Sequence, residues 1–258
     1  MKNKLKIIII IIISCFPNIV FSNSFILESE NIEILQDENQ IKAYKGKAIS
    51  NNNDLEINSD KFIYLKNLDI LKSSGNGRVS IKSKKLIIEY DNAIFDQKKL
   101  NLKADGNIKI YQINGNFVIK SDEILYDQKN NIVSSDSATK VEDKIGNTYF
   151  VDSFKYELNK NLLKVKNLFS KDSKQNTLKT SIAYINTNSG KIFGKDIKID
   201  LNDPSIQNEN DYRLRGNSVT MDENASEITK GIFTTCKKRD ECPPWQFSAK
   251  KIKHDKKK

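Results

Sequence analysis

Two similar stretches decide the fold: Gly77-Arg78-Val79-Ser80-Ile81 with Lys85-Leu86-Ile87-Ile88-Glu89-Tyr90, and Gly106-Asn107-Ile108-Lys109-Ile110 with Asp122-Glu123-Ile124-Leu125-Tyr126. In both, apolar side chains occupy every second position, which is the period of a β-strand with one face turned to an apolar interior. An amphipathic helix would instead place apolar residues three and four positions apart, and that spacing is missing here. Each stretch is therefore interpreted as a pair of strands that ends near a tyrosine.

The same signal recurs along the chain with a period of about thirty residues, which suits two strands and two turns per unit. Clusters of asparagine and glycine, such as residues 73–77 and Asn114-Gly115, are typical of tight turns between strands. None of the four prolines lies between Gly46 and Gly194, so the strands there keep their backbone donors. The sequence thus predicts an all-β fold of stacked antiparallel strand pairs. The anchors of the repeat are Gly46, Gly77, Gly106, Tyr64, Tyr90, Tyr126, Tyr156 and Tyr184.

The alternation also predicts which side chains line the interior, although a shift of one residue would exchange the two faces of a strand. A closed barrel, a solenoid and the two facing sheets of a jelly roll all satisfy the pattern. The interior is either a packed core or an apolar groove open along its length, and the pattern does not separate these. The residues expected to face the interior are Val79, Ile81, Ile88, Tyr90, Ile108, Ile110, Ile124, Tyr126, Phe154, Tyr156, Ile182 and Tyr184.

The N-terminus has the organisation of a signal peptide. Lys2, Lys4 and Lys6 precede an apolar run over residues 7–13 that is too short to span a bilayer. Residues 1–22 are predicted to be the signal peptide, with cleavage after Ser22. Lipidation at Cys15 or a retained anchor is the alternative. All three interpretations place the chain outside the cytoplasm.

Charge and composition argue against several functions. Most of the net charge of +10 comes from the lysines of the N-terminus and of residues 250–258, while lysines and acids alternate along the strands between them. A nucleic-acid site would need basic residues gathered on one face, so none is expected. No nucleophile motif or phosphate-binding loop occurs, and His254 is the only histidine. Neither an enzyme nor a metal site nor a cofactor is therefore expected, although a parallel β-helix carbohydrate-active enzyme could carry its acids in such a repeat.

The C-terminal region carries a resemblance. It reads Tyr212-Arg213-Leu214-Arg215-Gly216, Gly231-Ile232-Phe233-Thr234-Thr235-Cys236, Cys242-Pro243-Pro244-Trp245-Gln246-Phe247-Ser248-Ala249 and His254-Asp255. This segment resembles the junction between periplasmic domain and outer-membrane β-barrel in the LptD (OstA, organic solvent tolerance) family of lipopolysaccharide-assembly proteins. The upstream repeats resemble the OstA-type β-jelly-roll that this family shares with the LptA bridge proteins, and the similarity extends over about residues 30 to 255.

The resemblance implies a lipid-carrying jelly-roll over residues 23–229 and a cysteine-containing linker over 230–258 that leads toward a barrel absent from this chain. Lipid A acyl chains would lie in the apolar groove, in a protein of the periplasm associated with the outer membrane. An LptA-like bridge would pair with the first strands, around Ile32 to Ile41, and an LptE-like lipoprotein would bind only if a barrel were present. The alternatives are a free-standing LptA-like bridge and a structural β-solenoid or adhesin with a packed core.

Two cysteines remain after the signal peptide, Cys236 and Cys242. In an oxidising compartment such a pair is typical of a disulfide rather than a metal site. The resemblance places Cys236 at a position that members of the family join to cysteines of the barrel. A disulfide from Cys236 to Cys242 within the chain is the expectation in the absence of that partner.

Overall fold

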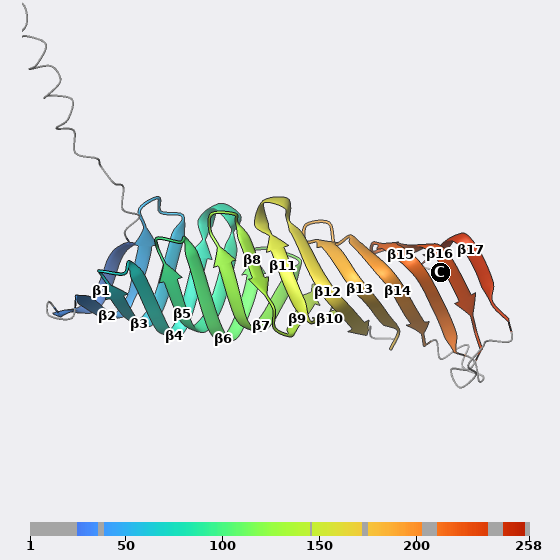
Figure 1. The fold of residues 1–258 in the computed structure, drawn as a ribbon, viewed down its shortest axis with the longest axis horizontal. Helices are drawn as coiled ribbons and strands as arrows, with labels where there is room; N and C mark the ends of the chain where they lie inside the picture. The colour runs from blue at the N-terminus through green and yellow to red at the C-terminus, as the bar shows by residue number, and fades with distance from the viewer. Residues whose placement is uncertain are drawn as a thin grey trace, which may run out of the picture.

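The computed structural model describes residues 25–35, 39–144, 146–171, 175–202, 211–236 and 245–255. These residues form a long antiparallel sheet whose bent strands follow one another along an elongated body (Figure 1). Two 3₁₀ turns interrupt the succession, η1 (Lys82–Lys84) and η2 (Leu158–Lys160). The strands are β1 (Phe25–Leu35), β2 (Gln40–Ser50), β3 (Leu55–Leu65), β4 (Ile70–Ile81), β5 (Leu86–Asp96), β6 (Asn101–Gln112), β7 (Phe117–Asp127), β8 (Ile132–Ser135), β9 (Thr139–Asp143), β10 (Thr148–Val151), β11 (Ser153–Glu157), β12 (Leu162–Lys171), β13 (Thr177–Asn186), β14 (Ile192–Leu201), β15 (Tyr212–Met221), β16 (Ala225–Thr234) and β17 (Phe247–Asp255).

Each strand pairs with the next along the chain, as expected for a meander of hairpins, from β1 with β2 to β16 with β17. The pattern changes only at the centre, where two long strands are each broken in two. There β7 pairs with both β8 and β9. In turn, β8 pairs with β11 and β9 pairs with β10, and β10 and β11 both pair with β12. The prediction of an all-β jelly-roll-like fold built from antiparallel strand pairs is confirmed.

The strands bend near their middles, at residues with positive φ. Asn76 in β4 has φ 46°, Asn107 in β6 has φ 49° and Asn167 in β12 has φ 51°. The ladders of β4 and β6 shift register at the same places, which marks β-bulges. Asparagine tolerates this backbone conformation better than other residues with a side chain. Residues 73–77 are predicted to be a turn between strands, but in the structure they form a bulge within β4. A bulge and a turn both need a residue with positive φ, so the same residue types occur in both.

Asparagine side chains also tie neighbouring strands together at these bends. The Nδ2 of Asn76 donates to Asp60, and that of Asn107 donates to Asp91, each over 2.7 Å. The side chain of Asn167 donates to Asp152 over the same distance. We call these contacts the corner pairs. The first two pairs join adjacent strands, and the third joins β12 to the link between β10 and β11, so together they mark the line along which the sheet is folded.

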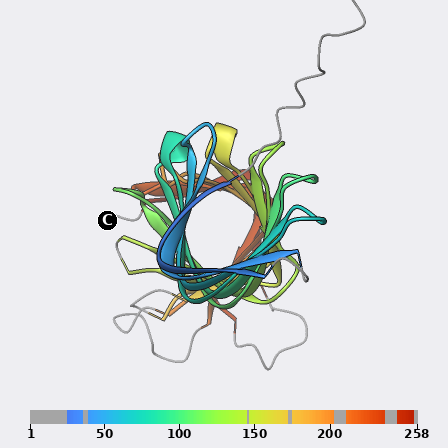
Figure 2. The ribbon, with the colours of Figure 1, turned by 90° about the vertical axis from the view of Figure 1, so that its left-hand side faces the viewer.

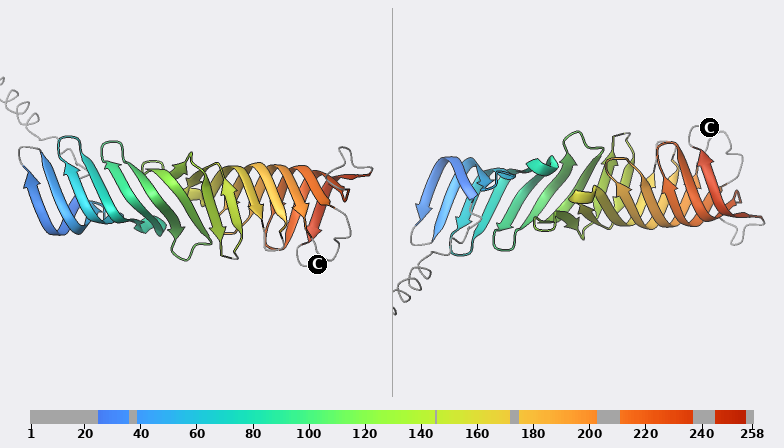
Figure 3. Two further views of the ribbon diagram at one scale, coloured as in Figure 1. Left: turned by 90° about the horizontal axis from the view of Figure 1, so that it is seen from below. Right: turned by 90° about the horizontal axis from the view of Figure 1, so that it is seen from above.

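The bends turn the two halves of each strand toward one interior. In β6, Leu102 and Ala104 precede the bulge, Ile108 and Ile110 follow it, and all four are at most 2% exposed. Seen along its length, the sheet curls around a common axis (Figure 2), and the views from below and above show the same slanted strands (Figure 3). The repeat thus produces one long apolar interior instead of a series of separate small cores.

One of the two predicted boundaries can be placed on this fold. The proposed signal peptide, residues 1–22, lies outside the described residues. The boundary predicted between residues 229 and 230 falls within β16, and β17 pairs with β16, so the C-terminal segment extends the same sheet. None of the helical segments in the described part of the chain has the length and apolar composition needed to cross a bilayer.

Candidate functional site: the apolar interior

Most of the residues predicted to face the interior do so. They come from β4, β5, β6, β7 and β11, and none of them is more than 4% exposed. Their side chains belong to one apolar cluster, which continues from Ala43 in β2 to Ile228 in β16. The predicted residues found in this cluster are Val79, Ile81, Ile88, Tyr90, Ile108, Ile110, Ile124, Tyr126, Phe154 and Tyr156.

The prediction is wrong for Ile182 and Tyr184, which lie on the outer side of β13. Their neighbours Ala183 and Ile185 fill the interior instead, each with 0% exposure. Outside, the ring of Tyr184 lies 6.4 Å from that of Phe193. Four consecutive residues of β13 are apolar, so alternation alone does not choose between the two faces, and neighbouring strands set the register.

Several interior residues were missed by the sequence analysis. They lie mainly on strand halves outside the two stretches that carry the strongest alternation. The same period of two identifies some of them, such as Leu102 with Ala104 and Leu163 with Val165. The largest of the missed side chains that are fully buried are Phe62, Leu55, Ile57, Leu71, Leu102 and Leu163.

The polar groups inside this cluster bond to one another. The hydroxyl groups of Tyr90 and Ser73 lie 2.7 Å apart, and those of Tyr156 and Thr187 lie 3.0 Å apart. Burial raises the pKa of Tyr90 to about 12, because the phenolate would lose its hydration. Tyr90 and Tyr156 therefore contribute apolar surface with satisfied hydroxyl groups.

In this structure the interior is closed. Side chains from both halves of the strands fill it so completely that Val79, Ile88, Leu163 and Val165 have 0% exposure. The expectation of a groove open along its whole length therefore does not describe this conformation. A ligand in the interior would have to replace contacts that these side chains make with one another.

Opposite the line of corner pairs, two rows of turns meet. The first row contains the turns after β4 and β6, and the second contains the turns after β11 and β13; we call their meeting line the seam. Lys84 donates from Nζ to Oδ1 of Asn159 over 2.5 Å. The side-chain Nδ2 of Asn116 donates to the carbonyl oxygens of Thr187, at 3.3 Å, and of Asn188, at 2.9 Å. In the end-on view η1 and η2 lie together at the top (Figure 2).

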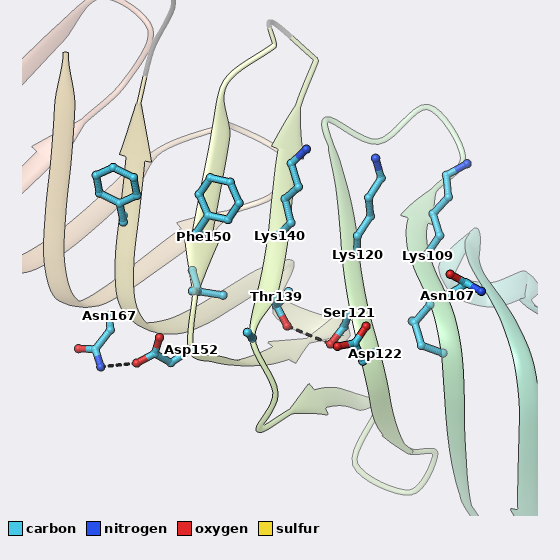
Figure 4. A pocket seen from close by; sticks show the side chains of 14 residues that line it. Asn107, Lys109, Lys120, Ser121, Asp122, Thr139, Lys140, Phe150, Asp152 and Asn167 are labelled. Carbon is cyan, nitrogen blue, oxygen red and sulfur yellow. Dashed lines mark hydrogen bonds between the residues drawn. The ribbon is translucent and has the colours of Figure 1, made fainter. Parts of the chain in front are cut away.

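A pocket of about 580 Å³ opens on the outer side of the sheet, where the long strands are broken (Figure 4). Lys109, Lys120 and Lys140 line it beside the ring of Phe150. Glu142 accepts from Lys120 at 2.7 Å and from Lys140 at 2.6 Å, so the two ammonium groups share one carboxylate. The lysines lie on the outer side of the sheet, while Ile108 and Val151 of the apolar cluster also line the pocket.

The structure describes only one of the two cysteines predicted to form a disulfide. Cys236 is a buried free thiol at 7% exposure, and its carbonyl oxygen accepts from Nη2 of Arg213 at 2.6 Å. Cys242 lies outside the described residues, so the predicted disulfide between them stays a prediction. Trp245 is half-exposed and packs edge-on against Phe247, with ring centroids 5.3 Å apart.

A scan against protein-family models finds no match to this chain, and a search of curated protein sequences finds none either.

Proposed function

We propose that this chain is a periplasmic lipid carrier of the lipopolysaccharide-assembly kind, which shields lipid A acyl chains in its interior on the way to the outer membrane. The single observation that supports this proposal most is the continuity of the apolar cluster from β2 to β16. A carrier needs such an unbroken track, because each methylene group exposed to water between two sites would cost about 0.8 kcal/mol.

The free edges of the sheet support the partner that we propose. Among the described residues, β1 forms a ladder only with β2 and β17 only with β16, so each is an edge strand of the described sheet. On β1, Ile32 and Ile34 are 49% and 60% exposed. Exposed edge strands with apolar side chains are suited to adding a strand from another protein. We propose an LptA-like bridge as the partner of β1, or that the chain itself is such a bridge.

The experiment places a photoreactive residue at Ile110 or Tyr126, inside the cluster, and exposes the protein to lipopolysaccharide before illumination. Lys109 is the matched control, because it neighbours Ile110 on β6 and lies on the outer side of the sheet. We expect lipid adducts from the interior positions and none from Lys109. Adducts from Lys109 alone would contradict the proposal.

One observation favours a second candidate, a structural β-solenoid or adhesin. The interior is closed by its own side chains, as the packing of a purely structural core would require. This candidate predicts no adduct from any of the three positions. It also predicts that lipopolysaccharide leaves the melting temperature unchanged, whereas a bound lipid stabilises a carrier by mass action.

A further inference from the structure

The seam differs from every other junction of the sheet in the bonds that close it. Adjacent strands are joined by backbone ladders, such as the ladder from Phe25↔Ser50 to Leu35↔Gln40. Across the seam, the bonds seen among the described residues come from side chains, those of Lys84 and Asn116. No backbone-to-backbone hydrogen bond crosses it in that part of the chain. Parting the two rows of turns therefore breaks fewer bonds than separating two of the long strands.

Water competes with these seam bonds. The contact between Lys84 and Asn159 is exposed, and so is the contact of Asn116 with the carbonyl of Asn188. A bond that both partners can replace by bonds to water contributes little to stability. Two of the three seam bonds are thus exposed and weak, while the bond from Asn116 to the carbonyl oxygen of Thr187 is partly buried.

The seam also lies directly over the interior. Thr187 is 4% exposed, and its carbonyl oxygen accepts from Asn116. Its hydroxyl group lies 3.0 Å from that of Tyr156, which belongs to the apolar cluster. A single residue therefore connects the seam with the interior. If the bond from Asn116 to Thr187 is broken, Tyr156 is the next side chain in the direction of the interior.

The opposite side of the sheet supplies a hinge. The bulges at Asn76 and Asn107 interrupt the register of the ladders, and glycines with positive φ, Gly75 at 80° and Gly106 at 77°, precede them. Bulges with glycine bend more easily than regular strand, because the ladder there is already broken. The corner line can therefore change its angle while the ladders on either side stay intact.

We propose that acyl chains pass into the interior sideways through the seam, which opens about the corner line when the bonds of Lys84 and Asn116 are released. This inference rests on the lipid-carrier function proposed above. The polar part of the lipid stays in water along the seam, and the acyl chains take the place of contacts between the two halves of the strands. Lipid then need not be threaded from one end of the body.

The test locks the seam. In a full-length background with all native cysteines replaced by serine, Lys84→Cys is combined with Asn159→Cys, and Asn116→Cys with Asn188→Cys. A short bismaleimide linker joins each pair. Loading is measured with purified lipid A as the probe and a photoreactive residue at Ile110. The control lock joins Ile94→Cys to Lys103→Cys, two exposed residues that lie opposite each other on β5 and β6, outside both the seam and the corner line.

We expect each seam lock to lower the yield of lipid A adduct at least tenfold relative to the same variant without linker, and the control lock to leave it within twofold. Equal loading of locked and unlocked proteins would overturn passage through the seam and leave the carrier function standing. An absence of adducts in the unlocked variants, with folding verified by circular dichroism, would overturn both. Equal loss from the control lock would show that any restraint blocks loading, and would also overturn the role of the seam.

Discussion

Gly77 offers a sharp test of how the repeat builds the interior. It lies opposite Tyr90 in the pairing of β4 with β5. A Cβ atom added at Gly77 would lie 2.1 Å from Cε2 and 2.4 Å from Cζ of the Tyr90 ring. The glycine therefore leaves room for an aromatic ring on the adjacent strand. We expect Gly77→Ala to push the ring of Tyr90 out of its position.

The cost follows from two losses. Overpacking a well-filled core destabilises by about 1–3 kcal/mol. A displaced Tyr90 also loses the buried bond of its hydroxyl group to Ser73, which costs roughly 1–3 kcal/mol when the partners stay unsatisfied. Alanine lowers the conformational entropy of the unfolded chain, and this offsets about 0.4–1 kcal/mol of the loss. The free energy of unfolding should therefore fall by about 1–6 kcal/mol.

Urea denaturation followed by circular dichroism measures this change. The decisive control repeats Gly77→Ala in a Tyr90→Leu background, where the clashing ring atoms are gone. There the substitution should be neutral or stabilise by a few tenths of a kcal/mol. An equal loss in both backgrounds would refute the explanation by ring contact. It would point to the backbone at Gly77 instead.

Three further predictions concern the register, the corners and the buried tyrosines. Ala183→Asp places a charge in the interior and should lower the free energy of unfolding by about 3 kcal/mol or more. Ile182→Asp, on the outer side, should lower it by less than about 1 kcal/mol. Equal losses in urea denaturation would contradict the observed register. Asn107→Ala loses the bond to Asp91 and puts alanine at φ 49°, so the melting temperature should fall. Asn107→Gly should retain most of the stability. A larger loss for glycine than for alanine would refute the role of positive φ. Because burial raises the pKa of Tyr90 from 10.0 to about 12, its contribution is fully present below pH 10 and is lost as the pH rises toward 12. Tyr90→Phe should therefore flatten the alkaline loss of stability, and an unchanged profile of melting temperature against pH would contradict this.

Much of the interior could be predicted from local pattern. Val79 with Ile81 and Ile108 with Ile110 alternate cleanly, and a polar residue between two apolar ones permits only one face to be buried. Ile182 and Tyr184 could not be placed in this way. Every residue from Ile182 to Ile185 is apolar, so either face of β13 satisfies the pattern, and only its pairing with β12 and β14 selects Ala183 and Ile185.

The amino-acid sequence by itself determined the class of fold, the antiparallel repeat and most of the apolar face, because these depend on a period of two and on residues close in the chain. Tertiary structure decided the corners, the seam and the closure of the interior. An asparagine with positive φ serves a turn and a bulge equally well, so Asn76 and Asn107 do not reveal from sequence which of these they form. The contact of Lys84 with Asn159 joins residues far apart in the chain, and it exists only because the bent strands bring their two rows of turns together.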